Sequence, residues 1–233
     1  MDKCDQYISC YRKDDCPGLV LGPEGCCSYF PQPFDIVHVG DWVETYTAKR
    51  FWPLDPRPED ICIEDIAHGL ALNCRYGGQC TYMYSVALHS INCAIVAQFR
   101  GWSTRMQLLC LLHDAAEFFG LDFARPIKGN VYVKIGDEFV QWKEHEHRIM
   151  AAIFEALGVA EPATNERILI KTVDTAVMLA EAKAIMPFKH WGKWDTSIPA
   201  DIHIQALPAA HVEWLFLKWF RELMAECERR VCK

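Results

Sequence analysis

The stretch that decides the fold is LLHDAAEFFGLD, residues 111–122. His113 and Asp114 stand side by side in a strongly apolar run, and Glu117 follows three residues later. On a helix with about 3.6 residues per turn, Glu117 is at i+4 from His113 and at i+3 from Asp114, which predicts one shared polar face. Burial of such a group without partners is costly, and a divalent cation would compensate it most directly. A polar stripe on an amphipathic surface helix is the alternative interpretation.

Two further apolar runs each carry a polar residue of the same kind. YSVALHSINCAIV, residues 84–96, contains His89, and LIKTVDTAVML, residues 169–179, contains Asp174. Two histidines and two aspartates from three helices would make a mixed nitrogen and oxygen site with room for water. The sequence therefore predicts one divalent metal ion, and this donor set suits Mn²⁺, Co²⁺, Fe²⁺, Zn²⁺ or Mg²⁺. The predicted ligands are His89, His113, Asp114 and Asp174.

The rest of the chain reads as an all-α protein with a small β element near its N-terminus. Apolar residues recur at three- and four-residue steps, which predicts helices at about 62–74, 84–100, 104–119, 137–157, 164–186 and 210–230. Ser103 is a predicted N-cap, and the apolar stripe of the last helix is predicted to be core. The partly alternating run DWVETYTAKRFW, residues 41–52, predicts a short hairpin. His145 and His147 do not face each other on a helix and are interpreted as part of a solvated face.

Length and charge set the class of protein. A chain of 233 residues suffices for one well-buried domain, here expected at 46–233 after an irregular Cys-, Pro- and Gly-rich extension at 1–45. The net charge of −7 excludes the basic footprint of a protein that binds long nucleic acid. No apolar run reaches the roughly 18 residues of a membrane span, and the first residues do not resemble a signal peptide. We expect a soluble cytoplasmic protein, in the host cytoplasm if it is phage-encoded.

Cysteine is abundant, with twelve residues. Cys93 and Cys110 lie in apolar helical runs, where a reduced thiol behaves as a small hydrophobe. The N-terminal cysteines lack the C-x-x-C spacing of a usual zinc site. We expect reduced structural thiols, with an accessory metal or a disulfide at the N-terminus as the alternative.

The order His89, then His113-Asp114, then Asp174 resembles the H…HD…D signature of the HD-domain phosphohydrolase superfamily. The resemblance covers about residues 47–190. It includes FWPLDPRPEDICIEDIAHGLALNCRYGGQCTYMYSVALHSIN and LLHDAAEFFGLDFARPIKG. These stretches are similar to the 5′-deoxynucleotidase branch, and they look closest to phage-type HD hydrolases, some of which are dATP triphosphohydrolases. The resemblance implies an HD-domain helical bundle.

The resemblance also implies roles for individual residues. The four residues of the signature would bind the metal, which polarises a phosphoryl oxygen and activates water. Glu117 would orient that water or hold the metal-bound network, and Asp122 would act as acid or base. The substrate-binding residues implied by the resemblance are Arg75, Tyr76, Pro126, Lys128 and Lys171. Cationic side chains suit phosphate oxygens, although a solvated surface charge is the commoner explanation for any one of them.

These observations favour an enzyme that hydrolyses 2′-deoxynucleotides, a small-molecule substrate, without long nucleic acid or a membrane as partner. Several basic residues near one metal exceed the need of a monophosphate, which favours a dNTP triphosphohydrolase that releases deoxynucleoside and triphosphate. A 5′-deoxynucleotidase acting on dNMPs is the alternative, and a non-catalytic nucleotide-binding HD protein is a more remote one. Relatives of this kind are commonly oligomeric, so the resemblance implies a homo-oligomer.

Overall fold

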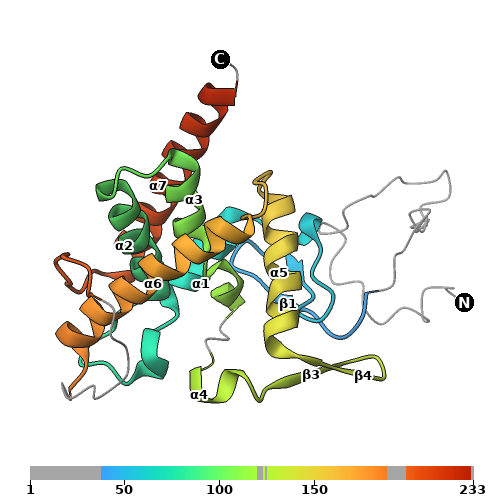
Figure 1. Cartoon of the computed structure of the whole chain (residues 1–233). Coiled ribbons are helices and arrows are strands. Elements are labelled where there is room, and N and C mark those ends of the chain that lie inside the picture. The colour runs from blue at the N-terminus through green and yellow to red at the C-terminus, as the bar shows by residue number, and fades with distance from the viewer. Residues whose placement is uncertain (1–37, 120–122, 124, 188–197, 232–233) are drawn as a thin grey trace, which may run out of the picture. The chain divides into compact units, whose positions relative to one another are not determined.

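The chain is mostly helical in a computed structural model that describes residues 38–119, 123, 125–187 and 198–231. Most of these residues lie in helices, and their strands form only two small antiparallel sheets (Figure 1). This agrees with the predicted all-α class. The predicted N-terminal extension lies outside the described residues as far as residue 37.

The hairpin predicted near the N-terminus is confirmed. Strand β1 (Val43–Glu44) pairs antiparallel with β2 (Arg50–Phe51). Phe51 is fully buried, and its ring lies 5.0 Å from that of Phe118 and 5.3 Å from that of Phe119. The hairpin is thereby anchored to the segment that follows the His-Asp pair. A short 3₁₀ turn, η1 (Pro58–Asp60), leads into the helices.

Five helices form the main body of the described chain. They are α1 (Ile63–Leu72), α2 (Val86–Phe99), α3 (Thr104–Leu112), α6 (Thr164–Ile185) and α7 (Ala209–Val231). Helix α2 packs on α3 and α6, and α7 packs on α1, α2 and α3 (Figure 1). Ser85 caps α2 by accepting from the backbone of Leu88, and Ser103 caps α3 by accepting from that of Met106.

The apolar stripe of α7 belongs to the core, as predicted. Val212, Phe216, Phe220 and Leu223 are all buried, and Phe216 is fully so. Their three- and four-residue spacing places them on one helix face. This face packs against α1 and α3 and completes the core on that side.

The helix predicted at 104–119 is wrong in its second half. Helix α3 ends at Leu112, His113 is its C-cap, and a separate 3₁₀ segment, η3 (Ala115–Phe119), follows. The i+4 geometry expected for His113 and Glu117 therefore does not apply. The break is supported from α1, because a Cβ on Gly69 would lie 1.8 Å from the carbonyl oxygen of Phe118. Only glycine lets the two backbones approach so closely.

The helix predicted at 137–157 begins later than expected. Strands β3 (Tyr132–Ile135) and β4 (Glu138–Gln141) form a second hairpin, and α5 (Trp142–Ala156) starts only after it. Between the strands, Gly136 adopts a φ of 60°, which a two-residue turn needs and most residues avoid. A four-residue helix, α4 (Arg125–Lys128), precedes this hairpin. Within the part of the chain that the structure describes, no helix is long and apolar enough to cross a membrane.

Candidate metal centre

His89 lies on α2 and is fully buried. Its Nδ1 atom is 2.9 Å from Oε1 of Glu181, a carboxylate on α6 that is also fully buried. A carboxylate accepts hydrogen bonds, so Nδ1 carries a hydrogen and Nε2 faces the other way. A carboxylate behind the histidine is the usual arrangement for a metal-ligating imidazole, because it fixes the ring and raises its basicity.

His113 is oriented in the same way by a backbone group. Its Nδ1 donates to the carbonyl oxygen of Cys110, at 2.8 Å, in the last turn of α3. Carbonyls in the last turn of a helix lack intrahelical partners, so this acceptor is available because the helix ends there. The Nε2 atoms of His89 and His113 lie 3.3 Å apart. The Nε2 atoms of the two imidazoles thus face one point.

Two carboxylates complete this group. Asp114 Oδ2 lies 3.2 Å from Nε2 of His113 and 3.8 Å from that of His89. Asp174 Oδ1 lies 3.3 Å from Nε2 of His89 and 3.9 Å from that of His113. The four residues predicted as ligands therefore converge from α2, the end of α3, and α6.

The electrostatics of the centre favour positive charge. Asp114 and Glu181 both lie beside the guanidinium of Arg75, and Asp174 lies beside His89. Burial alone would raise the pKa of Asp114 and of Asp174, but the neighbouring imidazoles hold both well below the ordinary range. Burial opposes the charging of His89, yet its acidic surroundings raise the pKa of His89 well above its usual value. When both imidazoles are neutral, Asp114, Asp174, Glu181 and Arg75 together carry a net charge of −2 before Lys171, the ion-pair partner of Asp174, is counted, so a divalent cation would offset excess negative charge.

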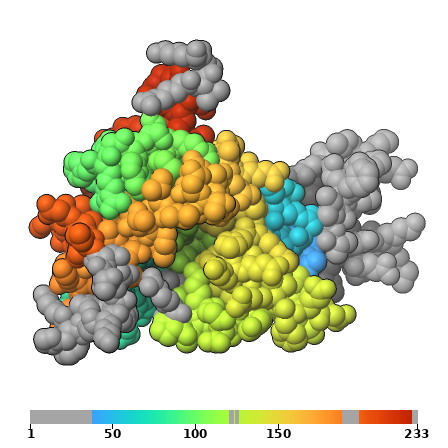
Figure 2. Space-filling view, in the orientation of Figure 1, coloured from blue at the N-terminus to red at the C-terminus, as the bar shows by residue number. Residues whose placement is uncertain are grey.

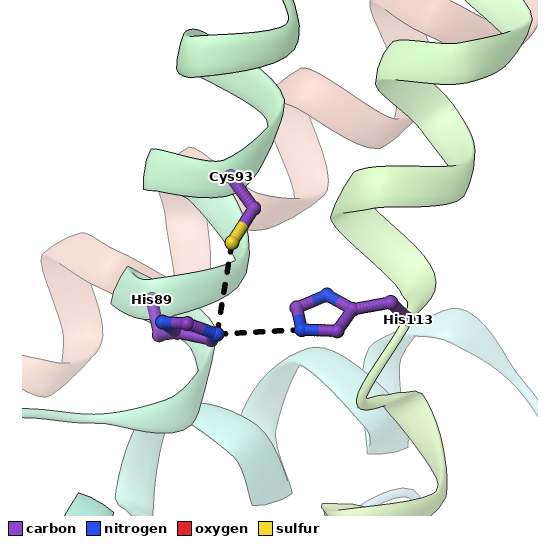
Figure 3. Close-up of side chains that lie close together, drawn as sticks. All are labelled: His89, Cys93 and His113. Atoms are coloured by element: carbon purple, nitrogen blue, oxygen red, sulfur yellow. Dashed lines mark hydrogen bonds between the residues drawn. The ribbon is translucent and has the colours of Figure 1, made fainter. Parts of the chain in front are cut away.

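The distances also suit a cation. Metal–ligand bonds of about 2.0–2.2 Å place adjacent donors roughly 3.0–3.4 Å apart. Cys93, one turn after His89 on α2, adds a sulfur donor: the ligand atoms of His89, Cys93 and His113 all lie within 4.8 Å of one another (Figure 3). The residues present could therefore hold a metal ion.

Arg75 and Tyr76 stand beside the centre on the 3₁₀ turn η2 (Arg75–Gly78). Arg75 Nη1 lies 3.5 Å from Asp114 Oδ2, and its Nε lies 3.3 Å from Glu181 Oε2. Tyr76 has a φ of 57°, which is unusual for a residue with a side chain, and its hydroxyl donates to the carbonyl of Met178. Both side chains thus reach towards α6, and Arg75 contacts a predicted ligand directly.

A cavity of about 670 Å³ opens next to the centre. Figure 2 shows the molecule hollowed between the orange surface of α6 and the yellow surface of α5. His113, Asp114 and Asp174 line it together with Lys128 and Lys171. Its other polar lining residues are Lys143, Glu146, His147, Glu161 and Arg167.

The two lysines predicted to bind phosphate are both at this cavity. Lys171 pairs with Asp174, one helical turn away, and most of its side chain is exposed. Lys128 Nζ lies 2.6 Å from Glu146 Oε1 and 3.7 Å from Glu117 Oε1. Burial works against its charge, but these carboxylates raise the pKa of Lys128 above its usual value. Pro126, also predicted, is exposed and is absent from the cavity lining given above.

The comparisons with known proteins give relatives without a described activity. No family model matches the chain. An uncharacterized protein of Rhodobacter capsulatus is 35% identical over 193 residues, which cover 75% of this chain and 91% of that protein. The chain belongs to the family of this protein. The uncharacterized protein YfdR of Escherichia coli is 27% identical over 187 residues, covering 78% of this chain and 95% of its own.

Of the two residues predicted to act in the reaction, the structure describes Glu117 but not Asp122. Glu117 is buried on η3 and faces Lys128, so it lies on the same side of the molecule as the centre. Asp122 lies outside the described residues. The interpretation of the two α5 histidines as part of a solvated face is wrong for His145, which is buried with Nε2 2.6 Å from the carbonyl oxygen of Pro53, whereas His147 is exposed and lines the cavity.

Two residues of this centre, Glu181 and Cys93, were not predicted from the sequence to have a functional role. Glu181 is seven residues after Asp174 on α6, hence on the same helix face two turns later. Cys93 is at i+4 from His89 on α2. A carboxylate within the apolar run of α6 and a thiol one turn from a ligand are the signals that could have pointed to them.

Proposed function

We propose that the protein is a metal-dependent phosphohydrolase of the HD-domain type that cleaves 2′-deoxynucleotides, with dNTPs as its substrates. The observation that carries the proposal is the convergence of His89, His113, Asp114 and Asp174 beside a cavity, with His–His and His–Asp separations of 3.2–3.9 Å. A purely structural polar cluster has no need of an adjoining cavity. A hydrolytic metal site needs one, because substrate and water must both reach the ion.

The size of the cavity supports a small substrate, and the four cationic side chains in its lining, which stand beside four carboxylates, could bind an anionic one. Pockets for small molecules measure roughly 300–1,000 Å³, and this one, at about 670 Å³, lies within that range. Lysine and arginine side chains around it suit phosphate oxygens. The deoxynucleotide class itself comes from the resemblance in the sequence around His89 and around the His113-Asp114 pair.

Each side chain has a distinct task in the proposed reaction. A divalent cation, when bound, would supply a polarised phosphoryl oxygen and an acidified water. Glu181 holds His89 in the orientation that this needs, and Arg75 keeps Asp114 in place. Glu117, next to Lys128, would orient the attacking water or hold a proton of it. Asp122 would serve the leaving oxygen as acid.

Triphosphate is favoured over monophosphate by the number of cationic side chains. Lys128, Lys143, Arg167 and Lys171 all line the cavity, and a monophosphate would use only the nearest of them. Several of these cations are already paired with carboxylates, such as Lys128 with Glu146. The monophosphate reaction of a 5′-deoxynucleotidase is therefore the second candidate.

A product assay tests the proposal. The full-length chain, loaded with Mn²⁺, Co²⁺ or Zn²⁺ in turn, is incubated with dNMPs and dNTPs, and phosphate is resolved from triphosphate. We expect triphosphate and deoxynucleoside from dNTPs, and loss of both in Asp174→Asn. Lys134→Ala is the matched control, because Lys134 is an exposed lysine on β3. Release of phosphate from dNMPs, with no reaction of dNTPs, would replace the triphosphohydrolase proposal by the monophosphatase. Inactivity on both substrate classes with metal bound would reject an enzymatic function.

A variant of Glu117 tests the assigned mechanism. Glu117→Gln keeps the size of the buried side chain but removes its charge. We expect turnover to fall by at least about 10²-fold, the low end for an acid–base group, with metal content unchanged. Near-normal kcat in this variant would remove Glu117 from the mechanism.

A further inference from the structure

The sulfur of Cys93 points at the same place as the two histidines. Cys93 Sγ lies 3.6 Å from Nε2 of His89, and the two Nε2 atoms lie 3.3 Å apart (Figure 3). Cys93 is 1% exposed and lies one turn after His89 on α2, so helix geometry holds both donors on one face.

These separations are those of a tetrahedral zinc site. With Zn–N bonds of about 2.0–2.1 Å and a Zn–S bond of about 2.3 Å, tetrahedral angles place two nitrogens about 3.3 Å apart and a nitrogen and a sulfur about 3.6 Å apart. Both values match the distances above. Asp174 Oδ1, at 3.3 Å from Nε2 of His89 and 3.9 Å from that of His113, is near enough to supply a fourth donor.

We propose that Cys93 is a metal ligand, and that the centre takes Zn²⁺ through His89, Cys93, His113 and Asp174. The two histidines then serve two donor sets. One is the carboxylate set with Asp114 and Asp174, which suits Mn²⁺ or Mg²⁺, and the other is the thiolate set, which suits softer ions such as Zn²⁺. When the zinc–sulfur bond forms, the S–H bond breaks and its proton passes to solvent, with no change in oxidation state.

A neighbouring thiol shows why burial alone does not explain this geometry. Cys110 is also fully buried and packs in the same small apolar cluster as Cys93. Burial raises the pKa of both thiols, so the two differ in what their sulfur atoms face and not in how deeply they are buried. Of these two thiols, Cys93 alone belongs to the group whose ligand atoms lie within 4.8 Å of one another.

This inference shares the metal centre of the proposed function but does not depend on its reaction. Cobalt reports directly on sulfur ligation, because a thiolate bound to Co²⁺ gives an intense charge-transfer absorption in the near ultraviolet. The full-length chain is stripped with a chelator, loaded with one equivalent of Co²⁺ and examined by absorption. We expect the band in the wild type and in Cys110→Ser, and its loss in Cys93→Ser and Cys93→Ala.

Affinity measurements give a second readout. Chelator competition should show that Cys93→Ser weakens Zn²⁺ binding by at least about tenfold and leaves Mn²⁺ binding within about threefold, because only the softer ion gains much from sulfur. X-ray absorption at the zinc edge of the wild type should show a sulfur neighbour at about 2.3 Å. This last measurement needs no variant and so does not depend on how well a variant folds.

The outcomes separate this inference from the proposed function. Cobalt bound without the band, a band that survives Cys93→Ser, or equal losses of Zn²⁺ and Mn²⁺ affinity would each overturn Cys93 as a ligand. An active phosphohydrolase without the band overturns only the present inference. A chain that has the band but releases no phosphate or triphosphate overturns only the proposed function.

Discussion

The carboxylate of Glu181 offers the sharpest single test of how the centre is built. The side chain is fully buried, with Oε1 2.9 Å from Nδ1 of His89 and Oε2 3.3 Å from Nε of Arg75. The hydroxyl of Tyr76, which shares its one hydrogen with the carbonyl of Met178, lies 3.4 Å from Oε2. Glu181→Gln keeps the shape and one acceptor oxygen, but it removes the charge and turns an amide NH₂ group towards groups that are themselves donors.

Two independent estimates give the size of the effect on metal binding. A hydrogen bond to a charged group contributes about 1.5–3 kcal/mol. Partners that orient a ligating histidine change metal affinity by about 10- to 100-fold, which is about 1.4–2.8 kcal/mol. We therefore expect Glu181→Gln to weaken metal binding by roughly 10- to 100-fold. In this variant Asp114, at 3.5 Å, would be the remaining ion-pair partner of Arg75 among the contacts described above. The free energy of unfolding should therefore also fall, by at most about 3–5 kcal/mol, the cost of breaking a buried ion pair.

The assay combines metal titration with thermal unfolding of the full-length chain. Tyr84→Phe is the control, because the Tyr84 hydroxyl hydrogen-bonds to the same carboxylate and its removal leaves the charge of Glu181 intact. This control should lose about 0.5–1.5 kcal/mol of stability and keep its metal affinity. If Glu181→Gln lowered the melting temperature but left metal affinity unchanged, the carboxylate would be only a structural ion-pair partner, and the reasoning would be refuted.

Three further predictions follow from the charges and the packing. Because the pKa of His89 is raised, its proton stabilises the metal-free chain most below about pH 6.5, and this contribution is lost as pH rises through the raised pKa. A bound metal ion must displace that proton, so the rise in melting temperature that metal causes should grow with pH. A rise that does not change with pH would contradict this prediction. Lys128→Ala/Lys171→Ala should lose roughly 10- to 150-fold per lysine in kcat/KM on dNTPs and much less on dNMPs, and equal losses would assign the lysines to the α-phosphate or the fold. Gly69→Ala should cost about 1–3 kcal/mol or more in urea unfolding, since its Cβ would lie 1.8 Å from a backbone oxygen of η3, whereas Gly129→Ala, with open space around it, should cost little.

The helices could be predicted from the sequence because burial of one face leaves a periodic trace. The limits of α2, α6 and α7 fall within two residues of the predicted ones. The hairpin of β3 and β4 was missed, since its short strands precede α5 without a break and the helical period of α5 appeared to extend into them. The signal was the Gly136-Asp137 pair between two runs of four residues, which is a typical two-residue turn.

The centre was predicted only as far as residue type and helix periodicity reach. His89, His113, Asp114 and Asp174 stand out because polar groups in apolar runs need partners, and the structure brings these four together. Glu181 contacts His89 across 92 residues of chain, and no local pattern encodes such a contact. Cys93 was taken as a small hydrophobe because a buried thiol usually is one.

The break between α3 and η3, which the sequence did not predict, is what makes the centre workable. Because the helix stops at Leu112, the carbonyl of Cys110 is free to orient His113 through Nδ1. The segment after the break then needs other support, and α1 provides it: Gly69 admits the η3 backbone, and Asn73 Nδ2 donates to the carbonyl of Glu117 at 3.2 Å. In an uninterrupted helix the carbonyl of Cys110 would accept an intrahelical hydrogen bond from the backbone four residues later. The interruption instead aims one imidazole at the centre and carries Glu117 towards Lys128, so the packing of α1 sets the geometry of a site to which it contributes no ligand.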